Sequence, residues 1–195
     1  MARTPSTMLP LGTTAPSFEL FDPGTSTTVS LDQVAGNSPL LVMFICNHCP
    51  YVIHVMAELG ALEKDYSARG LALVAINSND IENYPQDGPK EMVKLHKEEG
   101  WGFPFLLDED QSVAHAYRAA CTPDFYLFNG ERELVYRGQL DGSRPHNDVP
   151  VTGVDLRAAI EGVFSGDEAP GEQRPSLGCN IKWKDGNEPE YFPRK

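Results

Sequence analysis

Residues 40–50 read LLVMFICNHCP, and this stretch decides the fold. The six apolar residues at its start do not alternate with polar ones, which is typical of a central strand covered on both faces. Directly after them, Cys46 and Cys49 are separated by two residues, and Pro50 begins a predicted helix. The stretch therefore predicts a buried strand, a turn that carries two cysteines, and a helix.

The flanking sequence continues this alternation of strands and helices. Besides residues 40–45, the predicted strands are 71–77, 103–107, 124–129 and 133–139, and the predicted helices are 50–67, 89–99, 111–119 and 154–164. The short segments 18–20 and 28–31 flank an Asp-Pro-Gly turn signal and predict an N-terminal β-hairpin ahead of the main domain. The pattern predicts an α/β fold, a mixed central sheet with helices on both faces.

The length of 195 residues fits one domain with extensions. We expect an N-terminal segment over residues 1–15, the domain over 16–165 and a C-terminal extension over 166–195. The extension contains four glycines and four prolines, yet Ile181 and Trp183 alternate with lysines as they would in a short strand. We expect the extension to pack against the domain.

Composition excludes two classes of partner and suggests a compartment. With 28 acidic and 16 basic residues, the net charge is −12, so neither nucleic acid nor an anionic membrane surface is expected as a partner. Residues 1–16 lack an apolar run of signal-peptide length, and no run reaches the length of a membrane span, which favours a cytoplasmic protein. In that reducing compartment, a close cysteine pair is expected to be redox-active or metal-binding.

The two close cysteines are expected to act as a dithiol. A helix N-terminus stabilises a thiolate, so we expect Cys46 to be the exposed nucleophile with a lowered pKa and Cys49 to be the shielded, resolving thiol. His48 lies between them and can be cationic near neutral pH, which favours the reduced form and makes the couple less reducing.

Zinc is the competing interpretation of this spacing. A closed structural site needs four ligands, and the sequence contains no second C-x-x-C and no H-x-x-x-H. Cys121, Cys179 and His54 could in principle complete a site with the pair. We expect no bound metal and no cofactor, and a metal-binding or scaffolding protein remains the alternative from another class.

At this point the sequence resembles the thioredoxin superfamily, through the strand with its CNHCP turn, through Thr122-Pro123 and through the leader APSFEL at residues 15–20. The leader and the later V-S-L segment are similar to the AhpC/TSA and redoxin branch, which includes peroxiredoxins and TlpA-type oxidoreductases. The ending SLGCNIKWK at residues 176–184 resembles an uncharacterised peroxiredoxin-like subgroup of that branch.

The resemblance implies a thioredoxin-like sheet and roles for single residues. Pro123 would be a cis-proline facing the dithiol, and the backbone of Thr122 would pair with a bound peptide strand. Leu40 replaces the buried acid of thioredoxins, and Asp80 is either the acid of TlpA-type proteins or a solvated loop residue. Met43 stands where peroxiredoxins carry a threonine, so their peroxide pocket is not reproduced.

Two further cysteines are candidates for redox chemistry. Cys121 precedes Pro123 by two residues and is expected near the dithiol, as a third redox thiol or as a small buried residue. Cys179 has the same two interpretations, with a structural role favoured.

The function predicted from these residues is thiol-disulfide exchange. The expected substrates are protein or small-molecule disulfides, with a reducing partner such as a thioredoxin system. The alternative is a thiol-dependent peroxidase that acts on peroxides with the same cysteines.

Overall fold

The computed structural model describes residues 3–167 and 172–192. Its main sheet has seven strands in the order β3-β2-β6-β5-β4-β8-β9. These strands are β2 (Glu19–Asp22), β3 (Thr27–Ser30), β4 (Leu40–Phe44), β5 (Ala72–Asn77), β6 (Phe105–Leu107), β8 (Asp124–Phe128) and β9 (Leu134–Gly138). The helices are α1 (Leu31–Ala35), α2 (Pro50–Tyr66), α3 (Pro89–Glu99), α4 (Ser112–Ala116) and α5 (Val154–Ser165), with 3₁₀ turns at Ser67–Arg69 and Pro85–Asp87.

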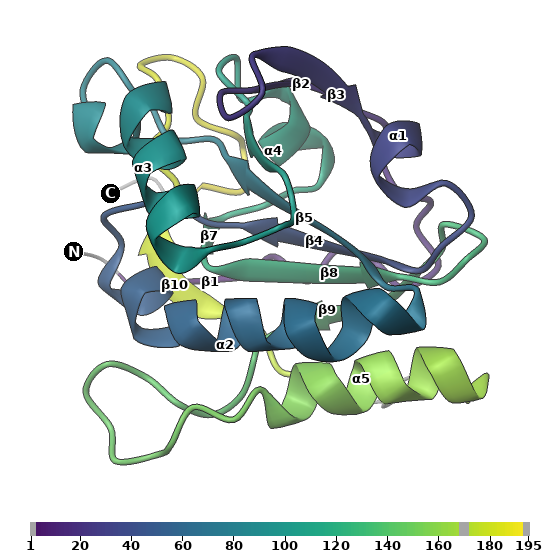
Figure 1. Cartoon of the computed structure of the whole chain (residues 1–195). Coiled ribbons are helices and arrows are strands. Elements are labelled where there is room, and N and C mark those ends of the chain that lie inside the picture. Colours follow the sequence, from purple (N-terminus) through teal and green to yellow (C-terminus); the bar gives the residue numbers. More distant parts are fainter. Residues whose placement is uncertain (1–2, 168–171, 193–195) are drawn as a thin grey trace.

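Strand β4 lies at the centre of the molecule, as its continuous apolar sequence predicted. It pairs with β5 in parallel and with β8 in antiparallel orientation, and all its side chains are buried. Successive side chains point to opposite faces of a sheet, so Leu41 and Met43 join one core and Leu40, Val42 and Phe44 join the other. Helices α2 and α5 cover the first face, and α1 and α4 cover the second (Figure 1). The predicted mixed α/β sheet is confirmed.

Two elements differ from the sequence-based expectations. The hairpin β2–β3 is not separate from the domain, because Phe21 of β2 pairs with Leu107 of β6 and extends the main sheet. Helix α4 is shorter than the predicted 111–119. Gln111 and Arg118 at its ends have φ of 65° and 52°, in the left-handed region, so the helix cannot extend through either residue.

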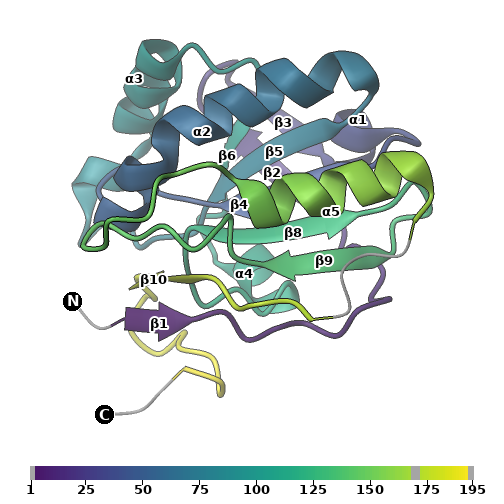
Figure 2. The same cartoon turned by 90° about the horizontal axis from the view of Figure 1, so that it is seen from below.

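The C-terminal extension packs against the domain through a second, three-stranded sheet. Strand β10 (Leu177–Asn180) lies between β1 (Arg3–Pro5) and β7 (Cys121–Thr122), antiparallel to both (Figure 2). The strand was expected around Ile181 and Trp183; both residues follow it and are buried. The parts of the expected terminal segments at 1–2, 168–171 and 193–195 lie outside the described residues.

In the described part of the chain, no helix combines the length and the apolar character needed to cross a membrane.

Candidate dithiol site

The cysteine pair lies between the end of β4 and the start of α2. Cys49 is the N-cap of α2, with Pro50 in the first helical turn, and its carbonyl oxygen accepts a hydrogen bond from the Val52 N–H at 2.9 Å. Cys46 and Cys49 are both buried, with 1% and 0% of their surface exposed. The expectation that Cys46 is exposed is therefore wrong, whereas Cys49 is shielded as expected.

Thr122 contacts both cysteines. Its hydroxyl lies 3.5 Å from the Cys46 sulfur, and its carbonyl oxygen lies 3.1 Å from the Cys49 sulfur, within reach of a hydrogen bond from the thiol. The Thr122–Pro123 peptide bond is cis, as the resemblance implied. The structure thus brings Cys46, Cys49, Thr122 and Pro123 together, as the sequence predicted.

Strand β10 places Cys179 beside the same threonine. Cys179 is the ladder partner of Thr122, and a side chain at Gly178 would overlap the Thr122 carbonyl oxygen, so the two backbones approach more closely than any other residue would allow. The backbone of Thr122 was expected to pair with a substrate peptide. In the structure, the chain's own C-terminal strand occupies that edge.

The ionisation of the pair also differs from the expectation. The Cys179 and Cys46 thiols hydrogen-bond to the Cys49 sulfur and lower the pKa of Cys49 well below its usual value, and the Val52 N–H adds to this effect. The same contact with Cys49, together with burial and the negative charge of Asp87, raises the pKa of Cys46. Cys49 is therefore the more acidic thiol of the pair.

Asp87 holds the dithiol turn from the other side, and the sequence did not reveal it. Its carboxylate accepts hydrogen bonds from the backbone N–H groups of Asn47 (2.9 Å) and His48 (3.3 Å) and from Asn79 Nδ2 (2.8 Å). It also lies 2.6 Å from His48 Nδ1, and its side chain is completely buried. His48 stacks on Tyr84, with ring centroids 5.7 Å apart. The imidazole is thus directed at a carboxylate and an aromatic ring.

The sequence gives only a weak indication that Asp87 contacts the dithiol turn, because Asp87 lies in a turn of its own. The Pro85-Gln86-Asp87-Gly88-Pro89 run marks only a break before a helix. Asp80, the acid that the resemblance suggested, stabilises the turn in which it lies. Its carboxylate accepts from the Glu82 N–H at 3.1 Å and from Asn83 Nδ2 at 2.6 Å. The acid that contacts the dithiol turn is therefore Asp87 and not Asp80.

Metal-ligand spacing occurs once among the described residues, in Cys46, His48 and Asp87, whose candidate ligand atoms lie within 4.8 Å of one another. Neither His54 nor Cys121 belongs to this group. Three ligands are one fewer than a closed structural zinc site requires. The four-ligand site that the sequence left open is therefore not assembled in this arrangement.

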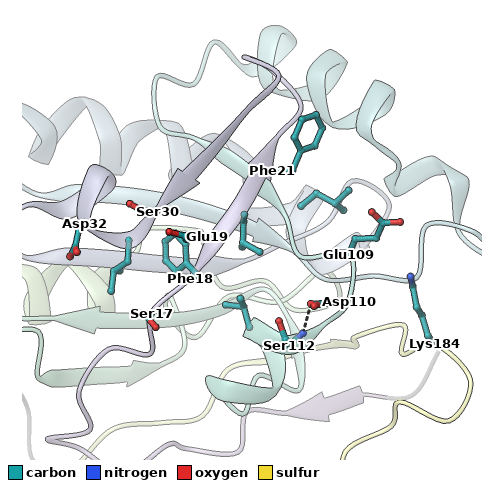
Figure 3. A pocket seen from close by; sticks show the side chains of 14 residues that line it. Ser17, Phe18, Glu19, Phe21, Ser30, Asp32, Glu109, Asp110, Ser112 and Lys184 are labelled. Carbon is teal, nitrogen blue, oxygen red and sulfur yellow. Dashed lines mark hydrogen bonds between the residues drawn. The ribbon is translucent and has the colours of Figure 1, made fainter.

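Two hollows in the surface differ in their position relative to the dithiol. A cavity of about 930 Å³ lies between β2, α1 and α4, with Asp32, Glu109 and Lys184 at its rim (Figure 3). None of the cysteines lines it. A smaller hollow of about 170 Å³ is lined by Asn47 and His48 together with residues of α3. This second hollow reaches the dithiol turn and has room only for a small molecule.

The chain resembles known proteins in sequence and in fold. The AhpC/TSA family matches residues 11–137. An uncharacterised conserved protein from Geobacillus kaustophilus is 51% identical, with a TM-score of 0.92 over 94% of this chain and 97% of that one. A hypothetical protein from Sinorhizobium meliloti is 47% identical, with a TM-score of 0.91 over 94% of this chain and 100% of that one.

A structure with lower sequence identity comes from a protein described as an oxidoreductase. The thioredoxin domain of a thiol-disulfide oxidoreductase from Bacteroides vulgatus is 19% identical, with a TM-score of 0.56 over 66% of this chain and 88% of that one. At this identity the likeness supports the thioredoxin-like fold alone. Among curated proteins, none matches the chain.

Proposed function

Since the chain belongs to the AhpC/TSA family and has a thioredoxin-like fold, we propose that its Cys46–Cys49 dithiol catalyses thiol-disulfide exchange. A redox function follows from the family, and the proposal adds the residues and the reaction. The observation that carries it is the position of the two buried sulfurs against Thr122, whose hydroxyl lies 3.5 Å from the Cys46 sulfur and whose carbonyl oxygen lies 3.1 Å from the Cys49 sulfur. Two cysteines placed in this way in one turn can close a disulfide with little movement of the backbone.

Cys46 is the attacking thiol in this proposal. The Cys49 sulfur is enclosed by Cys46, Cys179 and the Thr122 carbonyl, whereas Cys46 belongs to the turn that borders the small hollow. As the Cys46 sulfur attacks a substrate disulfide, the substrate disulfide bond breaks and the proton of Cys46 passes to the substrate sulfur that leaves. The more acidic Cys49 stays in the thiolate form for the second step.

Cys49 then completes the exchange. Its thiolate attacks the Cys46 sulfur of the mixed disulfide, the Cys46–Cys49 bond forms, and the second substrate thiolate leaves. The substrate gains two electrons and the dithiol loses two. A small thiol or a thioredoxin system returns the electrons in the next turnover.

Peroxide reduction by the same pair is the second candidate. The observation that favours it is the size of the approach, since both sulfurs are buried and the hollow beside the turn measures about 170 Å³. Against it, Met43 stands where peroxiredoxins place a threonine. Stopped-flow oxidation of the reduced protein by hydrogen peroxide and by a small disulfide, at equal concentrations, separates the two reactions.

The proposal is tested with a pair of serine variants. Cys46→Ser is expected to lower the rate of exchange with a small disulfide by about 100-fold or more, because the attacking sulfur is lost. Cys49→Ser is expected to accumulate a mixed disulfide at Cys46, which intact-mass spectrometry detects as one added substrate thiol. Cys121→Ala is the comparison variant: it removes the buried cysteine of β7, which has no role in the proposed reaction, and it is expected to retain activity. Full activity of the Cys46→Ser protein would refute the proposal.

A further inference from the structure

The C-terminal strand occupies the backbone edge at which a substrate peptide was expected to bind. In the antiparallel ladder between β7 and β10, Cys179 lies directly opposite Thr122. Gly178 makes this approach possible, because a side chain there would overlap the Thr122 carbonyl oxygen. The position that a peptide's cysteine would take beside the dithiol is therefore filled by a cysteine of the same chain.

Strand β10 places Cys179 beside the dithiol. Cys179 lies opposite Thr122 in the ladder, and the carbonyl oxygen of Thr122 lies 3.1 Å from the Cys49 sulfur. In agreement with this position, Cys179 is the largest influence on the pKa of Cys49, and Cys49 is the largest influence on the pKa of Cys179. The three cysteines are buried and belong to the same hydrophobic core. Cys49 thus has two sulfur neighbours, one in its own turn and one on β10.

We propose that Cys179 is a third redox thiol, which exchanges with the Cys46–Cys49 disulfide and converts it to a Cys49–Cys179 disulfide. This inference rests on the proposed function, since the first disulfide forms when the dithiol reduces a substrate disulfide.

The exchange step is balanced without a further oxidant. The Cys179 thiolate attacks the Cys49 sulfur, the Cys49–Cys179 bond forms, and the Cys46–Cys49 bond breaks with its electron pair on Cys46. The proton that leaves Cys179 ends on Cys46. One disulfide and one thiol are present before and after the step.

In the reduced protein the Cys179 thiol is difficult to deprotonate, and oxidation of Cys49 removes the main reason for this. In the reduced protein, the contact with Cys49 is the main cause that raises the pKa of Cys179, followed by burial. When Cys49 enters a disulfide, its negative charge is lost and with it the main obstacle to a Cys179 thiolate. The positive charge of Lys182 acts in the opposite direction and lowers the pKa of Cys179. The exchange therefore follows the oxidation of the dithiol.

The step has two consequences for the molecule. It returns Cys46 to the thiol form while the oxidising equivalent is stored deeper in the protein, so Cys46 can react again. It also links β10 covalently to the N-terminus of α2, which fixes the strand on the Thr122 edge. Small disulfides, which need no backbone edge, are the substrate class that this arrangement admits.

The test is a disulfide map of the full-length wild-type protein. The reduced protein is mixed with one equivalent of oxidised glutathione, quenched in acid, alkylated, digested and analysed by mass spectrometry. We expect two oxidised forms within about tenfold of each other, Cys46–Cys49 with alkylated Cys179 and Cys49–Cys179 with alkylated Cys46. Absence of the Cys49–Cys179 peptide, while Cys46–Cys49 forms normally, would overturn the inference and leave the proposed function standing.

Two variants separate the possible failures. In Cys46→Ala, diamide oxidation is expected to give the Cys49–Cys179 disulfide directly, which shows that the two sulfurs can bond; its absence counts against the inference. Cys121→Ala removes a buried sulfur on the neighbouring strand and is expected to leave the ratio of the two wild-type disulfides unchanged. If no disulfide forms at Cys46 or Cys49 in the wild-type protein, the proposed function itself fails.

Discussion

Asp87 and Asp124 are both completely buried near the dithiol, yet their surroundings differ. Asp87 accepts hydrogen bonds from two backbone N–H groups and from Asn79, and it faces the His48 ring. Asp124 follows Pro123 at the start of β8, where the Tyr126 hydroxyl donates to it at 3.0 Å and burial raises its pKa to about 7. For Asp124, burial outweighs the hydrogen bonds that it accepts and is the main cause of the raised pKa.

Because their contacts differ, Asp87 and Asp124 are expected to have different roles. Asp87 organises the turn that carries the cysteines, and its negative charge raises the pKa of Cys46. Asp124 lies in the ladder between β4 and β8, opposite Phe44, and accepts a hydrogen bond from the neutral Tyr126 hydroxyl. We expect substitution of Asp124 to change stability and substitution of Asp87 to change the chemistry as well.

The largest effect is expected for Asp124→Asn, in the dependence of stability on pH. The folded-state pKa of about 7 lies above the unfolded value of about 3.9, so the folded protein binds the proton more tightly. The stabilisation is present below about pH 4 and is lost as the pH rises to 7. Wild type is expected to lose ~4 kcal/mol of unfolding free energy over this range relative to Asp124→Asn, measured by urea denaturation.

A control and a contrary result sharpen this prediction. Glu131→Gln removes an exposed carboxyl from the turn between β8 and β9 and is expected to leave the pH profile of the wild type unchanged. If the unfolding free energies of wild type and Asp124→Asn changed with pH in the same way, Asp124 would have the same pKa in the folded and unfolded protein, which would contradict the prediction.

The second effect is expected for Asp87→Asn. The asparagine keeps one oxygen, which can still accept from the Asn47 and His48 N–H groups, but its amide nitrogen then faces the Asn79 Nδ2 donor. Because this donor loses its acceptor, the unfolding free energy should fall by about 2–3 kcal/mol. Loss of the negative charge should also lower the pKa of Cys46, which ultraviolet absorbance of the thiolate reports. A destabilised variant whose thiol titration equals that of the wild type would restrict Asp87 to a structural role.

The smallest effect is expected for His48→Ala. The variant removes the imidazole that lies 2.6 Å from the Asp87 carboxylate, so the negative charge of Asp87 acts more strongly on Cys46 and disfavours its thiolate. The couple should become more reducing, by on the order of 20 mV, in equilibrium with a glutathione buffer. His54→Ala, whose imidazole bonds to Ser143, is the control and should not shift the potential. A shift to a less negative potential would contradict this role of His48.

The local elements could be predicted well from the sequence. Residues 40–45 predicted the central strand and residues 50–67 the long helix, because an unbroken apolar run and a spacing of three and four are signals carried by neighbouring residues. The motif also placed Cys46, Cys49 and the Thr122–Pro123 pair in one site. The ends of α4 were harder to predict from the sequence, since the left-handed φ at Gln111 depends on contacts outside the helix.

The sequence by itself determined the fold class and the position of a close cysteine pair between a buried strand and a helix, since each depends on short-range patterns of apolar and special residues. Only the tertiary structure decided which of the two thiols is more acidic, which acid holds the turn and what fills the Thr122 edge. These outcomes depend on Asp87 and Cys179, which lie far from the dithiol in sequence and reach it through a loop and an added strand. Ionisation and access depend on burial and on the full set of nearby donors, and these arise only when distant segments pack together.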